Sequence, residues 1–268
     1  MKKLCLVAAL ALMIGCGEDE SPSNNANNTS SNNGQTTETN NSTTNNGDSG
    51  VDNSGITYQD SYQLIFDTMA FDEDSLAKSL NGLLAQNFDQ SLEFPIIVLV
   101  DLKSIDPDGG TLEIRGGSGL KTETDGEYIW DPEGDDSYDA GTLGSANGRV
   151  EGVLQTLNFV ATLVTETGTT KMPIPIRQLE FSGNMQLSED GSTGSIANGR
   201  MSGYLTKEDG DAAQVVIVPG GTPISITDLF KEDKLNYDSA SGELVAAGEG
   251  DSWLLNASFT AKPVVIVE

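Results

Sequence analysis

The chain of 268 residues contains no histidine and only two cysteines, Cys5 and Cys16. Beyond Cys16 there is therefore neither an imidazole nor a thiol. A disulfide, a cysteine nucleophile, a Cys/His zinc site and a Ser-His-Asp triad each need one of these side chains. Any chemistry of residues 17–268 must rely on carboxylates, hydroxyls, tyrosine and lysine.

Basic residues are scarce as well. The 14 Lys and Arg stand against 41 Asp and Glu, which gives a formal net charge of −27. A charge of this sign repels phosphate backbones, so we expect no nucleic acid partner. Divalent cations are compatible with it, and the same excess of acid also keeps an exported domain in solution.

The first sixteen residues form a targeting pattern. Lys2 and Lys3 make a positive start, and residues 4–14 are an apolar run. At about 1.5 Å per residue this run spans about 17 Å, which is short of the roughly 30 Å core of a bilayer. The segment Met13-Ile14-Gly15-Cys16 resembles the lipobox of bacterial lipoproteins, with Met13 where that family usually has Leu.

The resemblance implies a lipoprotein signal peptide over residues 1–15, cleaved between Gly15 and Cys16. It also implies that the Cys16 sulfur carries diacylglycerol and that palmitate completes a membrane anchor of three acyl chains. Gly17, rather than Asp, favours delivery to the outer membrane, facing the periplasm or the cell surface. If Cys16 is instead an incidental thiol behind an ordinary signal peptide, the protein is secreted or periplasmic.

Residues 16–55 have the composition of a linker. Positions 21–50 are mostly Asn, Ser and Thr, and they include no aromatic or branched aliphatic side chain. Such a stretch buries too little apolar surface to offset its ordering entropy. We therefore expect a disordered tether, with a span of about 35 Å as a flexible coil.

Residues 56–268 are long enough for a single domain with a substantial core. Apolar and polar residues alternate around Tyr62, Leu64 and Phe66, which is typical of strands. We predict a mainly β, antiparallel domain, either a sandwich or barrel-like. One helix is expected near residues 72–89, packed over a strand at residues 96–100 whose unbroken apolar run indicates cover on both faces.

An internal repeat supports this prediction. Residues 146–154, Ala-Asn-Gly-Arg-Val-Glu-Gly-Val-Leu, match residues 197–205, Ala-Asn-Gly-Arg-Met-Ser-Gly-Tyr-Leu. Alternation places Val150, Gly152 and Leu154 on one strand face, and the second copy likewise. Asn-Gly favours a tight turn, so each copy is expected to begin with a turn, and the inward glycines indicate close approach or a bend.

Arg149 and Arg200 occupy the same position of the two copies. One interpretation is a pair of guanidinium groups that grip a carboxylate or phosphate ligand. The other is that each arginine pairs with a neighbouring acid on an acidic surface. Pro173 and Pro175 remove ladder donors and predict an edge strand there.

An acidic loop at residues 131–139 is the second candidate site. Its oxygen ligands alternate as in a calcium loop, although it lacks the glycine and glutamate of an EF-hand. Tyr128 and Trp130 precede it on one strand face and could stack on a sugar ring, or could simply belong to the core. The candidate calcium ligands are Asp131, Glu133, Asp135, Asp136 and Asp139.

The leading functional prediction is a lipid-anchored envelope protein with a non-catalytic binding or structural domain and no cofactor. Its partner would be the membrane, with an envelope polysaccharide or a protein as a further partner. A calcium-dependent or carbohydrate-binding module is one alternative. A glycoside hydrolase that uses two carboxylates is another, because paired acids are the chemistry left to this composition.

Overall fold

A computed structural model describes part of the chain, and the predicted signal peptide, Cys16 and residues 17–51 of the predicted tether lie outside it. Residues 52–55, which the sequence analysis assigned to the tether, are described, and Asn53 is buried and donates to Met185 O at 2.8 Å. Most of the predicted helix at 72–89 also lies outside the described residues. The chain divides into two units, Met1–Asn46 and Gly47–Glu268, and every described residue belongs to the second. The described residues are 52–73, 78, 81, 88, 91–92, 95–132, 137–144, 148–165, 168–215 and 222–267.

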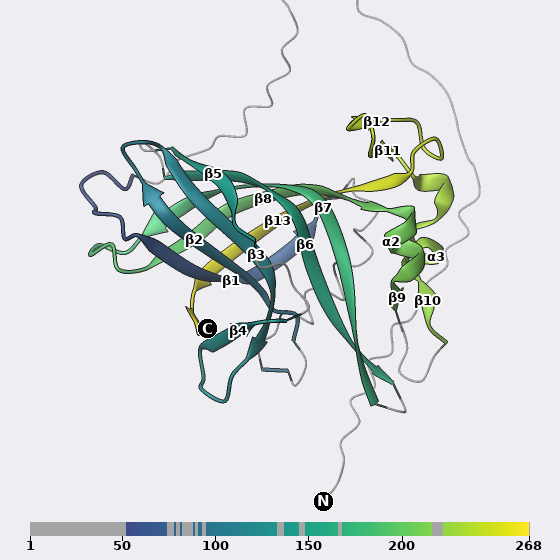
Figure 1. Ribbon diagram of the computed structural model, residues 1–268, viewed down its shortest axis with the longest axis horizontal. Helices are drawn as coiled ribbons and strands as arrows, with labels where there is room; N and C mark the ends of the chain where they lie inside the picture. The colour runs from purple at the N-terminus through teal and green to yellow at the C-terminus, as the bar shows by residue number, and fades with distance from the viewer. Residues whose placement is uncertain are drawn as a thin grey trace, which may run out of the picture. The chain divides into compact units, whose positions relative to one another are not determined.

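Antiparallel strands form a closed ring (Figure 1). Each strand of the ring pairs with the next, and β1 also pairs with β13, so that the sheet closes on itself. Within the described residues, each strand of the ring therefore has a paired neighbour on both sides over at least part of its length. The mainly β, antiparallel prediction is confirmed, in its barrel-like form. In order, the strands of the ring are β1 (Ser61–Phe71), β2 (Val98–Asp106), β3 (Thr111–Lys121), β5 (Asp139–Gly144), β6 (Arg149–Thr165), β7 (Gly168–Leu187), β8 (Gly194–Thr206) and β13 (Ser252–Pro263).

Alternating apolar residues fill the interior of the ring. Leu64 and Phe66 of β1 are 0% and 1% exposed, as the alternation predicts. The Phe259 ring stacks on Phe66 at 4.4 Å between centroids and on Phe181 at 5.1 Å. The interior is thus a packed core, which leaves the outer surface for binding.

The two repeat copies lie on β6 and β8, on either side of β7. Both glycines face the core at close approach: a Cβ on Gly152 would lie 2.6 Å from Ile114 Cδ1, and one on Gly203 would lie 2.7 Å from Ile176 Cγ2. This part of the prediction is confirmed. The predicted turn is present in the first copy, between β5 and β6, but it is wrong for the second, where Asn198 (φ 52°) forms an irregularity inside β8.

The apolar run at 96–100 is covered on both faces, as predicted. Val98 and Val100 point into the ring, while Ile97 and Leu99 belong to a second apolar cluster outside it. Among the described residues, the outer cover comes from β4 (Glu127–Trp130) and β14 (Val265–Ile266), a parallel pair. The sequence analysis did not anticipate this small outer layer.

The β6–β7 hairpin continues beyond the ring (Figure 1). Pairing of β7 with β8 begins at Arg177 and Tyr204, so residues 168–176 pair with β6 alone. Pro173 and Pro175 lie in this stretch, which confirms the predicted edge strand. Ser118 of β3 braces β6, because its hydroxyl donates to Asn158 O at 2.7 Å.

A helical insert between β8 and β13 packs against the ring core. Trp253 is fully buried there, donates from Nε1 to Lys231 O at 3.1 Å, and meets Phe230 edge to face. None of the described helices is long and apolar enough to span a membrane. The elements of the insert are α2 (Lys207–Ala212), β9 (Gln214–Val215), β10 (Ile224–Ser225), α3 (Ile226–Phe230), η2 (Glu232–Lys234), β11 (Tyr237–Asp238) and β12 (Glu243–Leu244).

Candidate functional site

A groove of about 620 Å³ lies on the outer surface of the ring, and we call it the outer groove. Its position follows from strand register. Glu151 lies opposite Ser182, which in turn lies opposite Arg200, so one row of outward side chains crosses β6, β7 and β8. A second row runs parallel to it. Its outward members are Val153, Glu180, Ser202 and Asn256.

Arg149 and Arg200 both line the outer groove. Arg149 lies on β6 and Arg200 on β8, with β7 between them. Neighbouring strands lie about 4.8 Å apart, so β6 and β8 are about 10 Å apart across the sheet. The sequence analysis thus selected two residues that do share a site. It missed Asp72, Glu180, Ser202 and Asn256, which no local pattern connects to the repeat.

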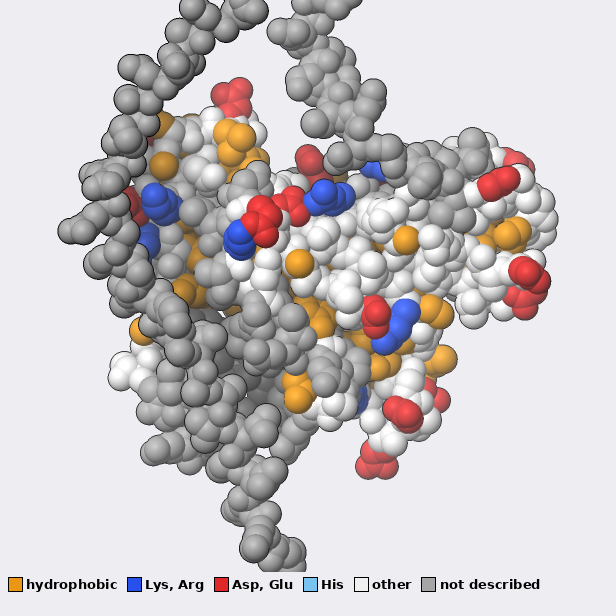
Figure 2. All heavy atoms as spheres, turned by 180° about the vertical axis from the view of Figure 1, so that it is seen from behind, with side chains coloured by type: hydrophobic (Ala, Val, Ile, Leu, Met, Phe, Trp, Pro, Cys, Tyr) orange, Lys and Arg blue, Asp and Glu red, His pale blue; other side chains and the backbone are white. Residues whose placement is uncertain are grey.

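Each arginine is held by an acid. Arg200 Nη1 lies 2.7 Å from Asp72 Oδ1 and 3.0 Å from Asp72 Oδ2. Arg149 Nε lies 2.5 Å from Glu151 Oε1. These contacts correspond to the acid-pairing interpretation, because each guanidinium group already contacts a carboxylate of the protein. Figure 2 shows a similar proximity of opposite charges on one face of the molecule, where Lys and Arg side chains lie beside Asp and Glu side chains.

Four other polar side chains of the outer groove lack a hydrogen-bond or ion-pair partner within the described part of the chain. Among the described residues, the side chains of Glu180, Ser182, Ser202 and Asn256 make no hydrogen bond or ion pair with the protein. The backbone of Asn256 is engaged: it pairs with Ser202 of β8, and its carbonyl accepts from Asp72 N at 2.9 Å. The groove therefore presents free donors and acceptors between two fixed ion pairs.

The candidate calcium ligands are only partly described. Glu133, Asp135 and Asp136 lie outside the described residues. Asp131 is buried, and its Oδ2 lies 2.7 Å from Lys171 Nζ, while Asp139 Oδ2 accepts from Gln155 N at 3.1 Å. No group of three or more acids that could hold a metal occurs among the residues the structure describes.

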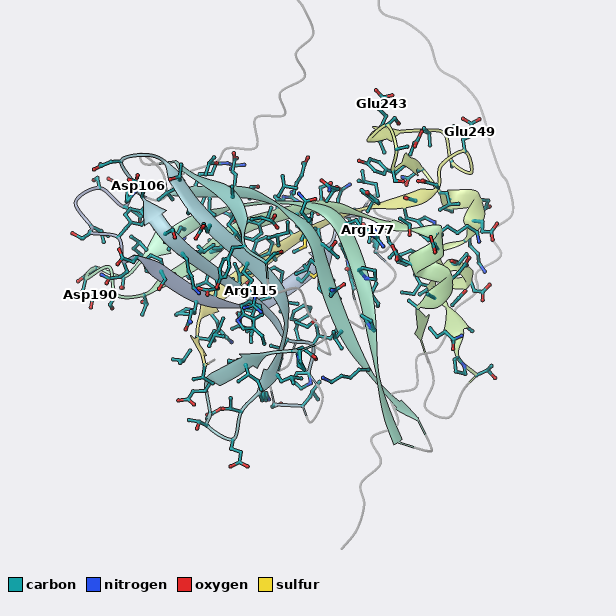
Figure 3. All side chains as sticks on the ribbon, in the orientation of Figure 1. Asp106, Arg115, Arg177, Asp190, Glu243 and Glu249 are labelled. Atoms are coloured by element: carbon teal, nitrogen blue, oxygen red, sulfur yellow. The ribbon has the colours of Figure 1, made fainter. Side chains whose placement is uncertain are left out.

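The candidate sugar-stacking residues lie outside the ring, on β4 of the small outer layer. Tyr128 is 6% exposed in the second apolar cluster, beside Leu99 and Ile266. The guanidinium carbon of Arg115, a residue labelled in Figure 3, lies 4.0 Å from the centroid of the Trp130 ring. Arg115 therefore covers one face of the Trp130 ring, and the other aromatic is packed in the cluster.

A buried carboxylate lies opposite Arg115 in the register of β2 and β3. Asp101 of β2 is 2% exposed, and its Oδ2 accepts from the Tyr138 hydroxyl at 2.7 Å. Burial raises the pKa of the Tyr138 hydroxyl, so it remains protonated and donates that bond at neutral pH. Lys103 Nζ lies 3.4 Å from the same oxygen and 4.6 Å from the centre of the Tyr138 ring. This cluster is a structural brace between β2 and the start of β5.

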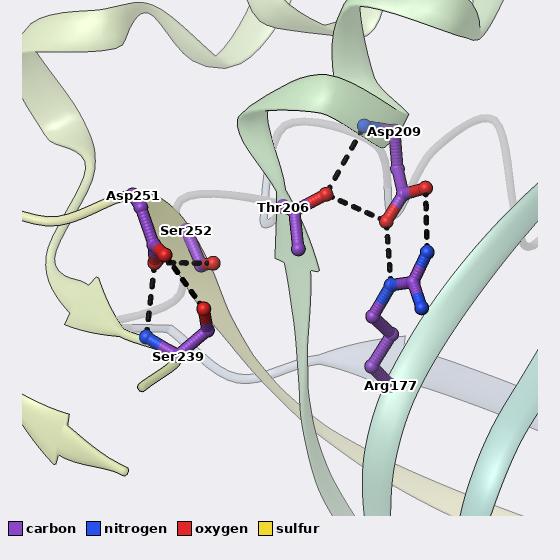
Figure 4. A network of polar contacts seen from close by, with 6 residues as sticks. All are labelled: Arg177, Thr206, Asp209, Ser239, Asp251 and Ser252. Atoms are coloured by element: carbon purple, nitrogen blue, oxygen red, sulfur yellow. Dashed lines mark hydrogen bonds and ion pairs between the residues drawn. The ribbon is translucent and has the colours of Figure 1, made fainter. Parts of the chain in front are cut away.

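Another polar network fixes the insert to the ring (Figure 4). Arg177 of β7 donates from Nε and Nη2 to the two oxygens of Asp209, at 2.8 and 2.9 Å. Burial raises the pKa of the Asp209 carboxyl, but the bonds from Arg177 and Thr206 outweigh it, so the pKa lies below the ordinary value. Asp251 holds Ser239 and Ser252 in the same way, with bonds of 2.6 to 2.9 Å.

Fold and site together define a closed antiparallel β ring with a polar groove on its outer surface. Comparison with known proteins finds no matching family model, no matching curated protein and no matching solved structure.

Proposed function

We propose that this protein is a lipid-anchored envelope protein whose β ring has a non-catalytic binding role. The anchor rests on the sequence of residues 1–16 and on its resemblance to a lipoprotein signal. The binding role rests on one observation, the outer groove, in which unpaired polar side chains lie between two fixed ion pairs.

The interior of the ring supports a binding role at the surface. Its side chains are packed, with Leu64, Leu102 and Val150 each 0% exposed. A ring of eight strands has an interior just wide enough for side chains to fill. A ligand would therefore meet the outer wall, which a tether would hold clear of the lipid surface.

Cell fractionation tests the anchor. We expect the protein to sediment with outer membranes, and the Cys16→Ser variant to lose diacylglycerol and to leave the mature membrane-bound fraction. Mass spectrometry of the N-terminal peptide should find Cys16 as the first residue with its acyl chains. A mature N-terminus elsewhere, or an unmodified Cys16, contradicts the proposed anchor.

A second candidate, a glycoside hydrolase using two carboxylates, gains support from one placement. Glu151 and Glu180 lie on neighbouring strands as diagonal neighbours in the same groove. Diagonal positions lie about 7–8 Å apart, within the range of about 5 to 9.5 Å that such enzymes use. Incubation with oligosaccharides, followed by mass analysis of the products, separates the two: cleavage that Glu180→Gln abolishes would establish the hydrolase.

A further inference from the structure

We propose that the outer groove binds a neutral, hydroxyl-rich oligosaccharide. The inference rests on the proposed binding function and names the ligand class of that same site. Three features of the groove carry it: its charge balance, its unpaired donors and acceptors, and one exposed apolar side chain in its lining.

The charge balance disfavours an ionic ligand. Two arginines and three carboxylates line the groove, Asp72, Glu151 and Glu180 being the acids. An anion would have to displace Asp72 from Arg200 and would then face Glu180. A cation would face Arg149 and Arg200. A neutral ligand needs neither ion pair to break, and the pairs then act as fixed, orienting dipoles.

The unpaired groups match hydroxyls. Arg200 uses Nη1 on Asp72, and among the described residues its Nε and Nη2 hydrogens have no protein partner. Glu180 offers acceptors, Ser182 and Ser202 offer either role, and the Asn256 amide offers both. A sugar hydroxyl donates and accepts at once, so it can bridge a carboxylate and a guanidinium that lie on neighbouring strands.

The groove also has an apolar spot. Val153 of β6 lies directly opposite Glu180 of β7 and is 40% exposed, although valine is an apolar residue. A pyranose ring has an apolar C–H face as well as its hydroxyls, so one sugar can cover Val153 while its hydroxyls reach Glu180 and Ser202. The volume of about 620 Å³ lies in the range of ligand sites, roughly 300–1,000 Å³.

The groove is built on rigid elements. Its polar groups stand on four paired strands of the ring, β6, β7, β8 and β13, whose registers fix their spacing. The Arg200–Asp72 contact further ties β8 to the residue that follows β1. Preorganisation of this kind reduces the entropy lost on binding.

The test uses the full lipidated protein in micelles of a detergent without a sugar headgroup. It is applied to an array of neutral oligosaccharides of glucose, galactose, mannose and N-acetylglucosamine, printed beside uronic acid and sulfated counterparts. We expect binding to neutral members. Calorimetry with the best neutral oligosaccharide should then show binding at least about tenfold weaker in Glu180→Gln, since a hydrogen bond to a charged group is lost. Ser202→Tyr, which fills the groove, should abolish binding.

The control is Glu113→Gln, the same change at an exposed glutamate of β3 outside the groove, and its affinity should equal that of the wild type. Near-ultraviolet circular dichroism of the buried Trp253 confirms that each variant is folded. Binding to anionic glycans alone, no binding by folded protein, or equal affinity in Glu180→Gln and Ser202→Tyr each overturns the inference. Membrane fractionation tests the lipid anchor independently of glycan binding. A negative result on the array would therefore not contradict the proposed anchor.

Discussion

The two copies of the repeat have nearly the same sequence but different surroundings. In both, alternation sends Val150 or Met201 into the core and Arg149 or Arg200 outward. In the first copy Gly148 closes a turn at φ 64°, whereas in the second Gly199 lies inside a continuous strand. The first arginine pairs two residues along its own strand, and the second pairs with Asp72, 128 residues away.

The difference shows which properties a short sequence carries with it. Side-chain alternation is inherent in an extended backbone, so it survives in both copies. Turn formation is not, because Asn-Gly permits positive φ without requiring a reversal of the chain. In the second copy, pairing with β7 and β13 continues on both sides of the Asn-Gly pair, and the same φ tolerance is used for an irregularity in the strand.

The largest expected loss of stability is at the glycine that follows Asn in both copies, Gly148 in the first and Gly199 in the second. An Ala Cβ at Gly148 would lie 2.4 Å from Asn53 Nδ2 and 2.8 Å from Met185 O in a left-handed backbone, and one at Gly199 would lie 2.4 Å from Phe259 Cζ. We expect unfolding free energies lower by about 3 kcal/mol for Gly148→Ala and about 2 kcal/mol for Gly199→Ala, from strain and overpacking. Urea melts measure both.

Gly126→Ala is the matched control for this pair. Gly126 has φ 82° but no atom within 4 Å of the added Cβ, so it isolates backbone strain. We expect a loss of about 1 kcal/mol. If Gly148→Ala costs no more than Gly126→Ala, the contact with Met185 O contributes nothing and the comparison fails.

The next largest difference in stability is expected between the two inward glycines, Gly152 and Gly203. An added Cβ at Gly203 would lie 3.1 Å from Arg177 O, a backbone atom, whereas at Gly152 the closest atom is Ile114 Cδ1, the end of a side chain that can rotate. Gly203→Ala should therefore cost about 2 kcal/mol and Gly152→Ala about 1 kcal/mol. Thermal unfolding followed by circular dichroism gives the order, and the reverse order would contradict this account.

Asn198 tests the strand irregularity. Asn tolerates φ 52° better than most residues, and Gly tolerates it best. Asn198→Ala should lower stability by about 1 kcal/mol, while Asn198→Gly should be close to neutral. Equal losses in the two variants would show that the Asn side chain, and not the backbone conformation, matters at this position.

The smallest effects are expected at the paired arginines. Arg200→Gln should cost up to about 1 kcal/mol and Arg149→Gln less, since both pairs are exposed to solvent. The two pairs are similarly exposed, with 54% and 32% for Arg200 and Asp72 against 36% and 51% for Arg149 and Glu151. Arg200 Nη1 contacts both oxygens of Asp72, so the Arg200 pair is expected to contribute more. A double-mutant cycle of Arg200→Gln with Asp72→Asn should show a coupling that disappears in 1 M salt. A coupling unchanged by salt would contradict a surface ion pair.

The local pattern was sufficient to predict several parts of the fold. The apolar run around Val98 required cover on both faces, and Pro173 and Pro175 required an edge. The short helices of the insert were missed, because five or six residues show no helical period. Their caps were nevertheless visible in the sequence: Thr206 precedes Asp209 by three residues, and Ser225 precedes Asp228 by three, the spacing of an N-terminal cap.

The candidate site was less accessible to sequence reasoning. Arg149 and Arg200 could be selected from the sequence because they occupy the same position of the two repeat copies. Asp72 and Asn256 enter the groove only through the closure of β1 on β13 and the pairing of β13 with β8. Register between distant strands depends on the whole set of pairings, and no short window of sequence contains it.

Closure of the ring between β1 and β13 has a consequence for the order in which the chain folds. The hydroxyls of Thr68 and Thr260, 192 residues apart, meet at 2.7 Å across that seam. Contacts between such distant residues form late, because a long loop must be ordered first. While the chain emerges from the ribosome, β1 has no β13 to pair with, so the ring stays open. The ring therefore cannot close until β13, its last long strand, has been made, and the chain before that point remains without its complete fold.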